Sequence, residues 1–305
     1  MATIQDVYTD VNRRHDFVML FDVTDGNPNG DPDAGNAPRV DPESLQGLVT
    51  DVAIKRKVRD YVEVAIGDEA RFKIYVQSGH ALNDQHQRAY TDLGLKSSGT
   101  RQDRSDVEKA RKWMCDNFYD IRMFGAVMTT GVNCGQVRGP LQLTFARSHD
   151  QILSLDVTIT RIAVTKPDDM KVVVSEEGEG KSGKNTEIGR KAIVPYGLYR
   201  AHGFFNPNYA KDTGATAEDL DLFWQAIQQM WDLDHSAARG MMSCRGLYVF
   251  SHESHLGNAP AHKLFERITV TRKPEVVAPR SFGDYTVTVN DTELPTGVSL
   301  TALVG

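Results

Sequence analysis

The sequence is poor in the features that mark secreted, membrane-spanning and zinc-binding proteins. Its 305 residues include three cysteines, which form no C-x-x-C pair and have no histidine at ligand spacing: Cys115, Cys134 and Cys244. This scatter argues against a disulfide scaffold or a structural zinc site. No run of eighteen apolar residues could span a membrane, and the first residues lack the basic and apolar regions of a signal peptide. Free thiols fit a reducing compartment, so we expect a cytoplasmic protein without a metal or other cofactor.

The sequence also lacks the excess of positive charge that nucleic-acid-binding proteins usually carry. It has 35 Lys and Arg against 41 Asp and Glu, which gives a net charge of −6. The acidity is local, however. Residues 1–54 contain 3 basic and 10 acidic side chains, so residues 55–305 contain 32 and 31. The net charge therefore excludes no class of partner.

The hydrophobic pattern predicts a mixture of helices and strands. Residues 16–24 are mostly apolar and predict a strand that is buried on both faces. Thr50 opens a helix with an apolar stripe, and further helices begin at the capping boxes of Ser105 and Thr216. Alternation over 151–160 predicts a strand with one buried face. Shorter strands are expected at 71–76, 246–251, 267–271 and 285–289, and no repeat of 20–50 residues is present.

Several segments predict loops instead. Residues 26–42 hold four prolines and three glycines, and a loop of this length is usually functional or disordered. A second glycine-rich loop covers 130–140, and 81–100 is polar and predicts an irregular insertion. Residues 166–194 predict a long hairpin with a charged, glycine-rich tip. The order of these elements favours an α+β, ferredoxin-like core with large insertions.

Two motifs imitate catalytic or metal sites. Residues 178–185 read G-x-x-x-x-G-K-N, in which asparagine replaces the Ser or Thr that a phosphate-binding loop needs for magnesium. His252 and His255 are three positions apart, whereas H-E-x-x-H zinc sites need histidines four apart on a helix. No serine or cysteine lies in a recognisable nucleophile motif. We therefore predict no catalytic residue and no metal ligand.

Positive charge is concentrated in three segments. Residues 55–59 carry four cations, residues 96–147 carry 9 basic against 5 acidic side chains, and residues 181–200 carry 5 against 1. Two of these segments lie beside glycine-rich loops, where backbone amides can approach phosphates closely. Each cluster alone is better explained as a solvated helix face. Together they favour salt-dependent binding to a nucleic-acid backbone.

The segment RHDFVMLFDVTDGNPNGDPDAGNAPRVDP, followed by GLVTDVAIKRKVRDYV, resembles the Cas-seven-type backbone subunit of the type I-C CRISPR Cascade complex. The segments DIRMFGAVM, GQVRGPLQ, ITRIAVT, GRKAIVPYGLYRAHGFF and RGLYVF extend the resemblance in the same order. It implies a single domain over 1–305, with a modified RRM-like palm. It also implies a helical finger insertion at 66–150 and a β-hairpin thumb at 166–194.

The resemblance implies a function as well. Copies of such a subunit assemble head to tail along the CRISPR RNA, and the thumb of one copy displaces a base at regular intervals. The segments between stay free to pair with target DNA, while companion Cascade subunits process RNA and cut DNA. The expected partners are therefore CRISPR RNA, target DNA through the guide, further copies of the chain and other Cascade subunits. The resemblance implies no nuclease activity and no membrane contact.

The family's RNA-binding elements map onto particular residues of this sequence. They fall on the first glycine-rich loop, the basic helix, the second glycine-rich loop and the thumb: Asn27, Asn29, Gly30, Lys55, Arg56, Lys57, Arg59, Gln136, Arg138, Gly139, Lys184, Arg190 and Lys191. Two departures from a standard RRM are present. No aromatic pair for base stacking is evident on a strand. The thumb tip carries Glu176, Glu177 and Glu179, which we expect to face a neighbouring subunit.

Two other functions stay open. A ribonuclease on a related RRM-like fold could process CRISPR RNA with His149, His252 or an aspartate such as Asp31. A protein–protein scaffold without nucleic acid is the third possibility. Incubation with labelled RNA, and the nucleic-acid content of the purified chain, separate these three.

Overall fold

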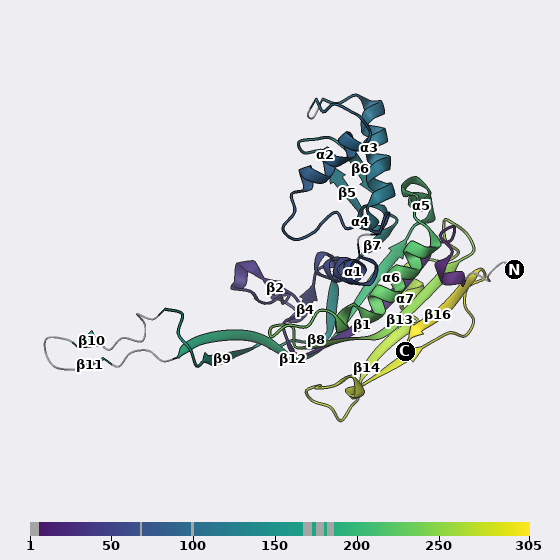
Figure 1. Ribbon diagram of the computed structural model, residues 1–305. Helices are drawn as coiled ribbons and strands as arrows, with labels where there is room; N and C mark the ends of the chain where they lie inside the picture. The colour runs from purple at the N-terminus through teal and green to yellow at the C-terminus, as the bar shows by residue number, and fades with distance from the viewer. Residues whose placement is uncertain (1–5, 68, 99–100, 167–172, 175–179, 182–185) are drawn as a thin grey trace.

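The computed structural model describes residues 6–305 except 68, 99–100, 167–172, 175–179 and 182–185. A large antiparallel sheet forms its centre, with strand order β16-β13-β1-β12-β8-β4 (Figure 1). Strands β7 and β9 pair with β12 outside this order. The strands are β1 (His15–Gly26), β4 (Gln46–Val49), β7 (Leu141–Leu143), β8 (Ala146–Gln151), β9 (Leu155–Arg161), β12 (Glu187–Phe205), β13 (Met241–His252) and β16 (Val298–Val304).

Strand β1 lies between β12 and β13 and is buried along most of its length. Phe17, Met19 and Phe21 point to one face of the sheet and join the main core. Val18 and Leu20 point to the other face and join a smaller cluster. Because both faces are covered, the strand is continuously apolar, as its sequence predicts.

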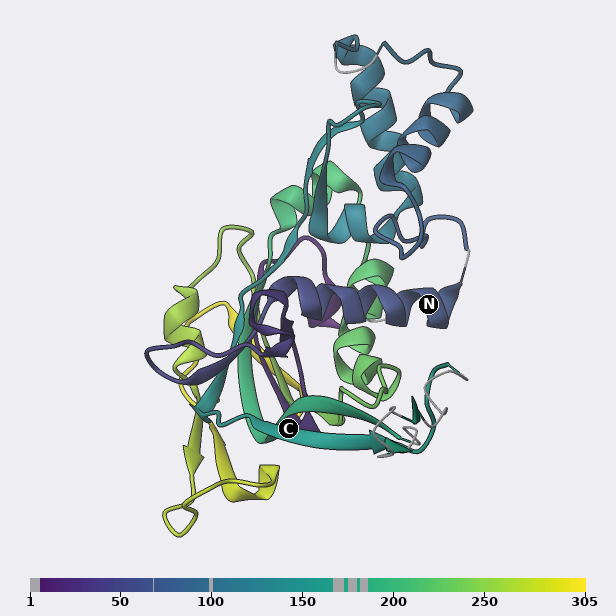
Figure 2. The ribbon, with the colours of Figure 1, turned by 90° about the vertical axis from the view of Figure 1, so that its left-hand side faces the viewer.

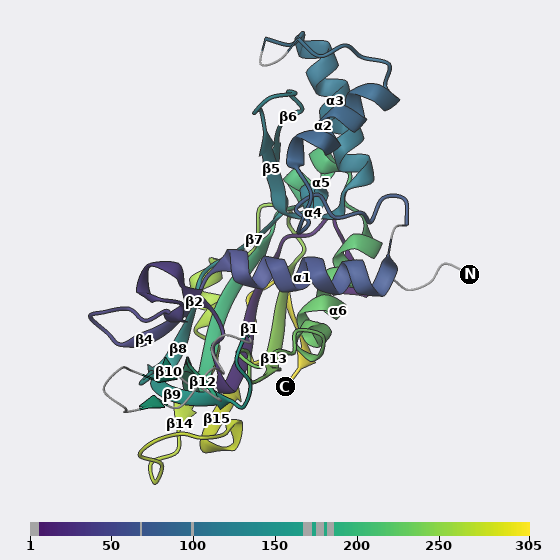
Figure 3. The same cartoon turned by 60° about the vertical axis from the view of Figure 1, so that its left-hand side comes forward.

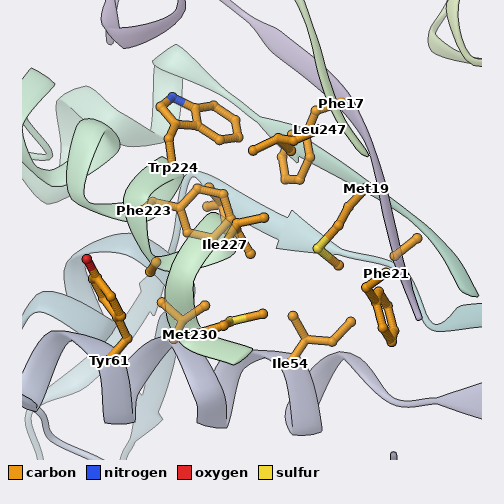
Figure 4. Packing of buried hydrophobic residues seen from close by; sticks show 14 of the residues in the cluster. Phe17, Met19, Phe21, Ile54, Tyr61, Phe223, Trp224, Ile227, Met230 and Leu247 are labelled. Carbon is orange, nitrogen blue, oxygen red and sulfur yellow. The ribbon is translucent and has the colours of Figure 1, made fainter. Parts of the chain in front are cut away.

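Helices α1 (Asp51–Ile66) and α6 (Ala217–Gln229) cover one face of the sheet. Figure 4 shows Ile54 of α1 and Phe223 and Trp224 of α6 packed around the side chains of β1. The opposite face is covered by α7 (Ala261–Phe265) and the β14–β15 hairpin, Ile268–Arg272 and Tyr285–Val289. The predicted capping box at Thr216 is confirmed at the start of α6.

A helical projection over 82–138 extends away from the sheet (Figure 1). It contains α2 (Leu82–Asp92), α3 (Arg104–Asn117), α4 (Tyr119–Phe124), β5 (Gly125–Met128) and β6 (Gly135–Arg138). It has its own buried cluster, which includes Tyr90, Met114 and Phe118. The prediction of an irregular segment at 81–100 is wrong over α2, where His86, Ala89 and Tyr90 are buried at helical spacing. The stripe is short and its neighbours are polar and exposed, so the helix was not recognised from the sequence.

Two further predictions in this region differ from the structure. Residues 71–76 form no strand, because only an isolated bridge joins Lys73 to Phe118. Helix α3 begins two residues earlier than expected, and Asp103 caps it by accepting a hydrogen bond from the Ser105 amide at 2.8 Å. The side chain of Glu108 pairs with Arg104 instead of completing a capping box at Ser105.

A β-hairpin of β9 and β12 leaves the opposite end of the sheet (Figure 1). Its register runs from Leu155↔Ile193 to Arg161↔Glu187, so its first arm begins before the predicted 166–194. All seven residues of β9 are exposed. The predicted buried face is therefore wrong, since the hairpin leaves the body and no layer of the described residues covers it. Most of the phosphate-loop-like motif at 178–185 lies outside the described residues.

The remaining elements are short. They comprise β2 (Gly30–Asp31), β3 (Ala37–Pro38), β10 (Val173–Val174), β11 (Gly180–Lys181), α5 (Pro207–Thr213) and 3-10 turns at Val7–Thr9, Pro32–Ala34, Met230–Asp232 and Phe282–Asp284. The sequence analysis missed β16, which forms an edge of the sheet. Within the described part of the chain, every helix is too short or too polar to cross a membrane.

Candidate nucleic-acid interface

The elements that carry most of the predicted site residues lie on one side of the molecule. In Figures 2 and 3, α1 runs across this side, between the helical projection and the β9–β12 hairpin. The first glycine-rich loop, with β2 and β3, lies at the N-terminal end of α1. The fold thus brings together segments that are separated by more than a hundred positions in the sequence.

The first glycine-rich loop is fixed to the start of α1. The side-chain oxygen of Asn29 accepts hydrogen bonds from the Thr50 amide at 2.9 Å and the Thr50 hydroxyl at 3.0 Å. Thr50 in turn caps the helix by accepting from the Ala53 amide at 3.2 Å. A Cβ on Gly30 would overlap the side chain of Asn36, which would have to move to make room for it. Asn29 and Gly30 therefore lie where the partial positive charge of a helix N-terminus favours anions.

A loop over 234–240, which the sequence analysis did not single out, supports the same region. The Asn27 amide donates to the Ala238 carbonyl at 2.7 Å, and a Cβ on Gly26 would overlap the Arg239 carbonyl. Lys191 of the hairpin donates to the Ala237 carbonyl at 2.8 Å. This loop joins the glycine-rich loop to the base of the hairpin. The sequence signal that could have found it is its run of small residues before Arg239 and the glycine at 240.

The four cations of α1 each pair with a carboxylate. The pairs are Lys55 with Asp51 at 2.9 Å, Arg56 with Asp60 at 2.7 Å, Lys57 with Asp234, and Arg59 with Asp120 at 2.8 Å. Their exposed side-chain fractions differ widely: 13% for Lys55, 41% for Arg56, 4% for Lys57 and 11% for Arg59. Helix α1 therefore does not present the free basic surface that its sequence suggests.

Lys57 lies deepest of the four cations. Burial, followed by the charge of the nearby Arg239 guanidinium, lowers the pKa of Lys57 to about 7. Asp234 contacts both cations, because Arg239 lies 3.0 Å from the same carboxylate. The ammonium group of Lys57 also approaches the ring of Trp231. Lys57 thus holds α1 against the 234–240 loop, and through that loop it is linked to Asn27 and Lys191.

The second glycine-rich loop packs behind α1. The Phe124 ring lies 5.6 Å from the Lys55 ammonium and 5.4 Å from the Arg59 guanidinium. Gly139 lies directly against Phe124, where a Cβ would overlap the backbone. Gln136 and Arg138 are exposed, and the Arg138 guanidinium lies 4.5 Å from the centre of the Tyr209 ring on α5. Arg138 therefore contacts α5 and not α1.

The hairpin residues are divided between exposed and anchored positions. Arg190 is exposed on β12, while its neighbour Lys191 is partly buried and anchored to Ala237. Lys184 lies outside the described residues, as do the glutamates of the predicted thumb tip, Glu176, Glu177 and Glu179. Of the hairpin residues predicted to bind RNA, Arg190 is thus a described cation with an exposed side chain.

The three residues proposed for a ribonuclease lie apart in the structure, and each has its own interaction partners. His252 is fully buried, with Nε2 3.1 Å from Asp16 Oδ2 and Nδ1 accepting from the Asn258 amide at 2.8 Å. Asp31 caps a 3-10 turn and pairs with Arg39, and the exposed His149 contacts the edge of Tyr285. No cluster of three His, Cys, Asp or Glu side chains that could hold a metal occurs among the described residues.

Comparison with known proteins identifies relatives. Residues 13–290 match the family model of CRISPR-associated protein Cas7. The CRISPR-associated protein Cas7 of Haloferax volcanii is 25% identical over 237 residues, which are 70% of this chain. The matched region spans 64% of that relative, which is less than two thirds of its length.

Three solved structures match this chain at low sequence identity. A chain of a CRISPR RNA-guided surveillance complex in a pre-nicking state has a TM-score of 0.47 and 14% identity, with 78% of both chains covered. A chain of another such surveillance complex has a TM-score of 0.44 and 13% identity, over 78% of this chain and 68% of the other. A chain of a type III-B Cmr-β complex bound to cognate target RNA has a TM-score of 0.39 and 13% identity, over 81% of this chain and 63% of the other.

Proposed function

Because this chain belongs to the Cas7 family of CRISPR-associated proteins, we propose that it is a non-catalytic backbone subunit that binds CRISPR RNA in a type I-C Cascade complex. The observation that carries the proposal is the family match over residues 13–290, which includes the whole helical projection and the β9–β12 hairpin. The subunit works in the cytoplasm beside the other Cascade subunits. It presents the guide for pairing with target DNA in antiviral defence.

The proposal gives each part of the fold a role. The single domain over 1–305 has an RRM-like palm, which corresponds to the central sheet with α1 and α6. The finger at 66–150 corresponds to the helical projection with its flanking segments. The thumb at 166–194 is extended by β9, whose seven residues pair with β12. Both projections and α1 border the side of the molecule seen in Figure 2, and this supports a path for RNA along α1.

We assign two kinds of role to the proposed RNA-binding residues. Asn29, Gly30, Gln136, Arg56 and Arg190 are exposed or partly exposed and are proposed to touch the RNA backbone directly. The second group positions these contacts through packing and ion pairs: Asn27, Lys55, Lys57, Arg59, Gly139 and Lys191. Arg138 is exposed and would contact RNA from the α5 side. Lys184 stays a proposed contact of the thumb.

The hairpin surface supports assembly of several copies. Leu155, Val157 and Ile159 lie on one face of β9, and all three are exposed. Exposed apolar side chains grouped in this way mark interaction surfaces. We propose that the thumb of one copy rests on the next copy along the guide, so that the copies form a head-to-tail filament.

The test is RNA binding by the purified full chain, followed by its assembly. We expect a high ratio of nucleic-acid to protein absorbance in a sizing-column peak whose size grows with RNA length. Alanine at Arg56, Arg138 and Arg190 together should weaken binding and flatten its dependence on salt, because single-stranded affinity changes with a log–log slope of about −0.7 per phosphate contact. Alanine at Arg104, Lys109 and Lys112, three exposed and acid-paired cations of α3, is the matched control. A chain that binds no RNA would overturn the proposal.

The absence of catalysis has its own test. Labelled CRISPR RNA precursor incubated with the protein, with and without a divalent cation, should stay intact. Cleavage that is lost in His149→Ala would instead support the ribonuclease alternative, since His149 is the exposed candidate of the three.

A further inference from the structure

A polar cavity of about 420 Å³ lies where the helical projection meets the end of α1. The C-terminal turns of α1 contribute Glu63 and Gly67, and α2 contributes Gln85 and Arg88. The connecting segment contributes Lys73, Ile74, Gln77 and His80, and Phe118 completes the wall. None of these residues belongs to the predicted RNA-binding set. The cavity is large enough for a small ligand of nucleotide size.

The cations of this cavity differ from those of α1. Among the described residues, Lys73 and Arg88 have no carboxylate within ion-pair distance, whereas all four cations of α1 do. The one carboxylate of the cavity wall, Glu63, accepts a hydrogen bond from the Gln77 side chain at 2.5 Å. Lys73 and Arg88 therefore place two cations without an ion-pair partner in a wall that holds one carboxylate, and this excess of positive charge suits a phosphate.

The cavity wall also offers hydrogen-bond acceptors. The carboxamide oxygen of Gln85 is buried and has no hydrogen-bond partner among the described residues. Gly67 ends α1, so the carbonyl groups of its last turn face this region with partial negative charge. Because no internal bond holds the Gln85 carboxamide, it can turn its oxygen or its nitrogen toward a ligand. These groups suit the amino and ring nitrogen groups of a nucleobase.

The geometry points to a nucleotide-binding pocket at the base of the helical projection. We propose that one unpaired nucleotide of a single strand enters it, with its phosphate on Lys73 and Arg88 and its base edge on Gln85. Ile74 and Phe118 supply the apolar wall that a base needs. A simple anion would use only the two cations, and the Glu63 carboxylate and the last carbonyl groups of α1 would repel it. The inference rests on the proposed function, because it adds a second contact point for the same kind of ligand.

The first test separates the phosphate contact from general electrostatics. Lys73→Gln with Arg88→Gln removes two charges at the pocket, and Lys273→Gln with Arg280→Gln removes two exposed charges on a distant loop. Binding of labelled single-stranded RNA to the full chain is measured across a salt series. The pocket variant should reduce the magnitude of the log–log slope by about 1.4, as expected for two lost phosphate contacts. The control variant should leave the slope unchanged.

The second test addresses the base. Gln85→Leu removes the hydrogen-bonding group without a change of charge, so the salt slope should stay constant. The differences in affinity among oligoadenylate, oligocytidylate and oligouridylate should shrink at the same time. Photo-crosslinking with thio-substituted bases, placed either in the guide RNA or in a target DNA strand, shows which strand supplies the nucleotide. The crosslinked peptide should lie within residues 73–88 or contain Phe118.

The outcomes distinguish this inference from the proposed function. Equal salt slopes for the two double variants, or crosslinks that avoid these peptides in both strands, would overturn the pocket while RNA binding still supports the backbone subunit. A wild-type chain that binds no RNA would overturn both. Circular dichroism of each variant checks the fold, and a folded Gln85→Leu protein with unchanged base preferences also counts against the pocket.

Discussion

The Arg122 side chain joins the base of the helical projection to the helix layer on the sheet. Its guanidinium donates to both carboxylate oxygens of Asp219, one of them at 2.9 Å, and both side chains are fully buried. Asp219 also accepts from Arg71 at 3.0 Å and from the Thr216 amide that it caps. Burial opposes ionisation of Asp219, but the hydrogen bonds and charge of Arg122 outweigh it and lower its pKa. The Asp219 carboxylate thus joins the base of the helical projection to the start of α6.

We predict that Arg122→Ala destabilises the protein by about 3–5 kcal/mol, because it leaves a buried carboxylate without its main partner. The free energy of unfolding in urea measures this. Arg104→Ala is the control, since it breaks an exposed ion pair with Glu108 in which Arg104 is 94% exposed. That change should cost less than about 0.5 kcal/mol. Equal effects of the two substitutions would contradict the assigned role of Arg122.

His15 predicts how stability depends on pH. Burial lowers its pKa to about 4, and its ring nitrogens bond to Ser251 and to the Asp10 carbonyl. The unfolded chain binds a proton near pH 6.5, whereas the folded chain resists protonation. The contribution is therefore fully present above pH 6.5 and is lost as the pH falls toward 4, by about 3 kcal/mol at most.

His15→Gln should accordingly flatten the pH dependence of the unfolding free energy between pH 6.5 and 4. The exposed His235→Gln should leave the curve unchanged. If the unfolding free energies of the wild type and His15→Gln depended on pH in the same way, groups other than His15 would determine the loss of stability at low pH.

At this scale, the sequence analysis located cations but not their partners. Asp120 lies 61 positions after its partner Arg59 in the sequence. Asp234 lies 177 positions after its partner Lys57. A pattern within one helix could not reveal them, because the tertiary fold brings these acids to α1. The same holds for Arg138, whose contact with Tyr209 depends on the placement of α5.

At the scale of elements, the sequence analysis succeeded where local pattern and burial agree. Strand β1 is apolar throughout because two layers cover it, and α6 begins at its capping box. It failed at β9, whose alternating pattern predicts a buried face, because burial also requires a covering layer. It failed at α2 for a different reason, since a three-residue apolar stripe is short against its polar surroundings.

The exposed face of β9 leads to a prediction about assembly. Val157→Glu with Ile159→Glu places charge on the apolar face of the hairpin, where we propose that the next copy rests. Since these side chains are exposed in the single chain, the melting temperature should change little. RNA-dependent growth of the complex should be lost, as measured by light scattering on a sizing column.

The control for this prediction uses the other face of the same strand. Thr158→Glu with Thr160→Glu adds the same charge at exposed positions that alternate with the apolar ones. This variant should still assemble on RNA. Assembly by both variants would mean that the apolar face of β9 is not part of the contact.

At the scale of the whole molecule, the expectation of mixed helix and strand is confirmed, with one large antiparallel sheet as its centre. Net charge turned out to be a poor guide to electrostatics. The value of −6 includes acids that neutralise cations at specific places, such as Asp51 and Asp60 on α1. Phosphates that approach α1 must therefore compete with carboxylates of the protein itself. Placement of charge, and not its sum, determines what this surface can bind.

This competition gives the last prediction. Asp60→Asn removes the partner of Arg56 and raises the net charge from −6 to −5, since one acidic residue is lost. Asp291→Asn makes the same change of net charge at an exposed position in the C-terminal region. If α1 lies on the RNA path, freeing Arg56 should strengthen RNA binding by about two- to fivefold, the value of one exposed ion pair. Asp291→Asn should change affinity much less, and equal gains in the two variants would mean that only net charge matters.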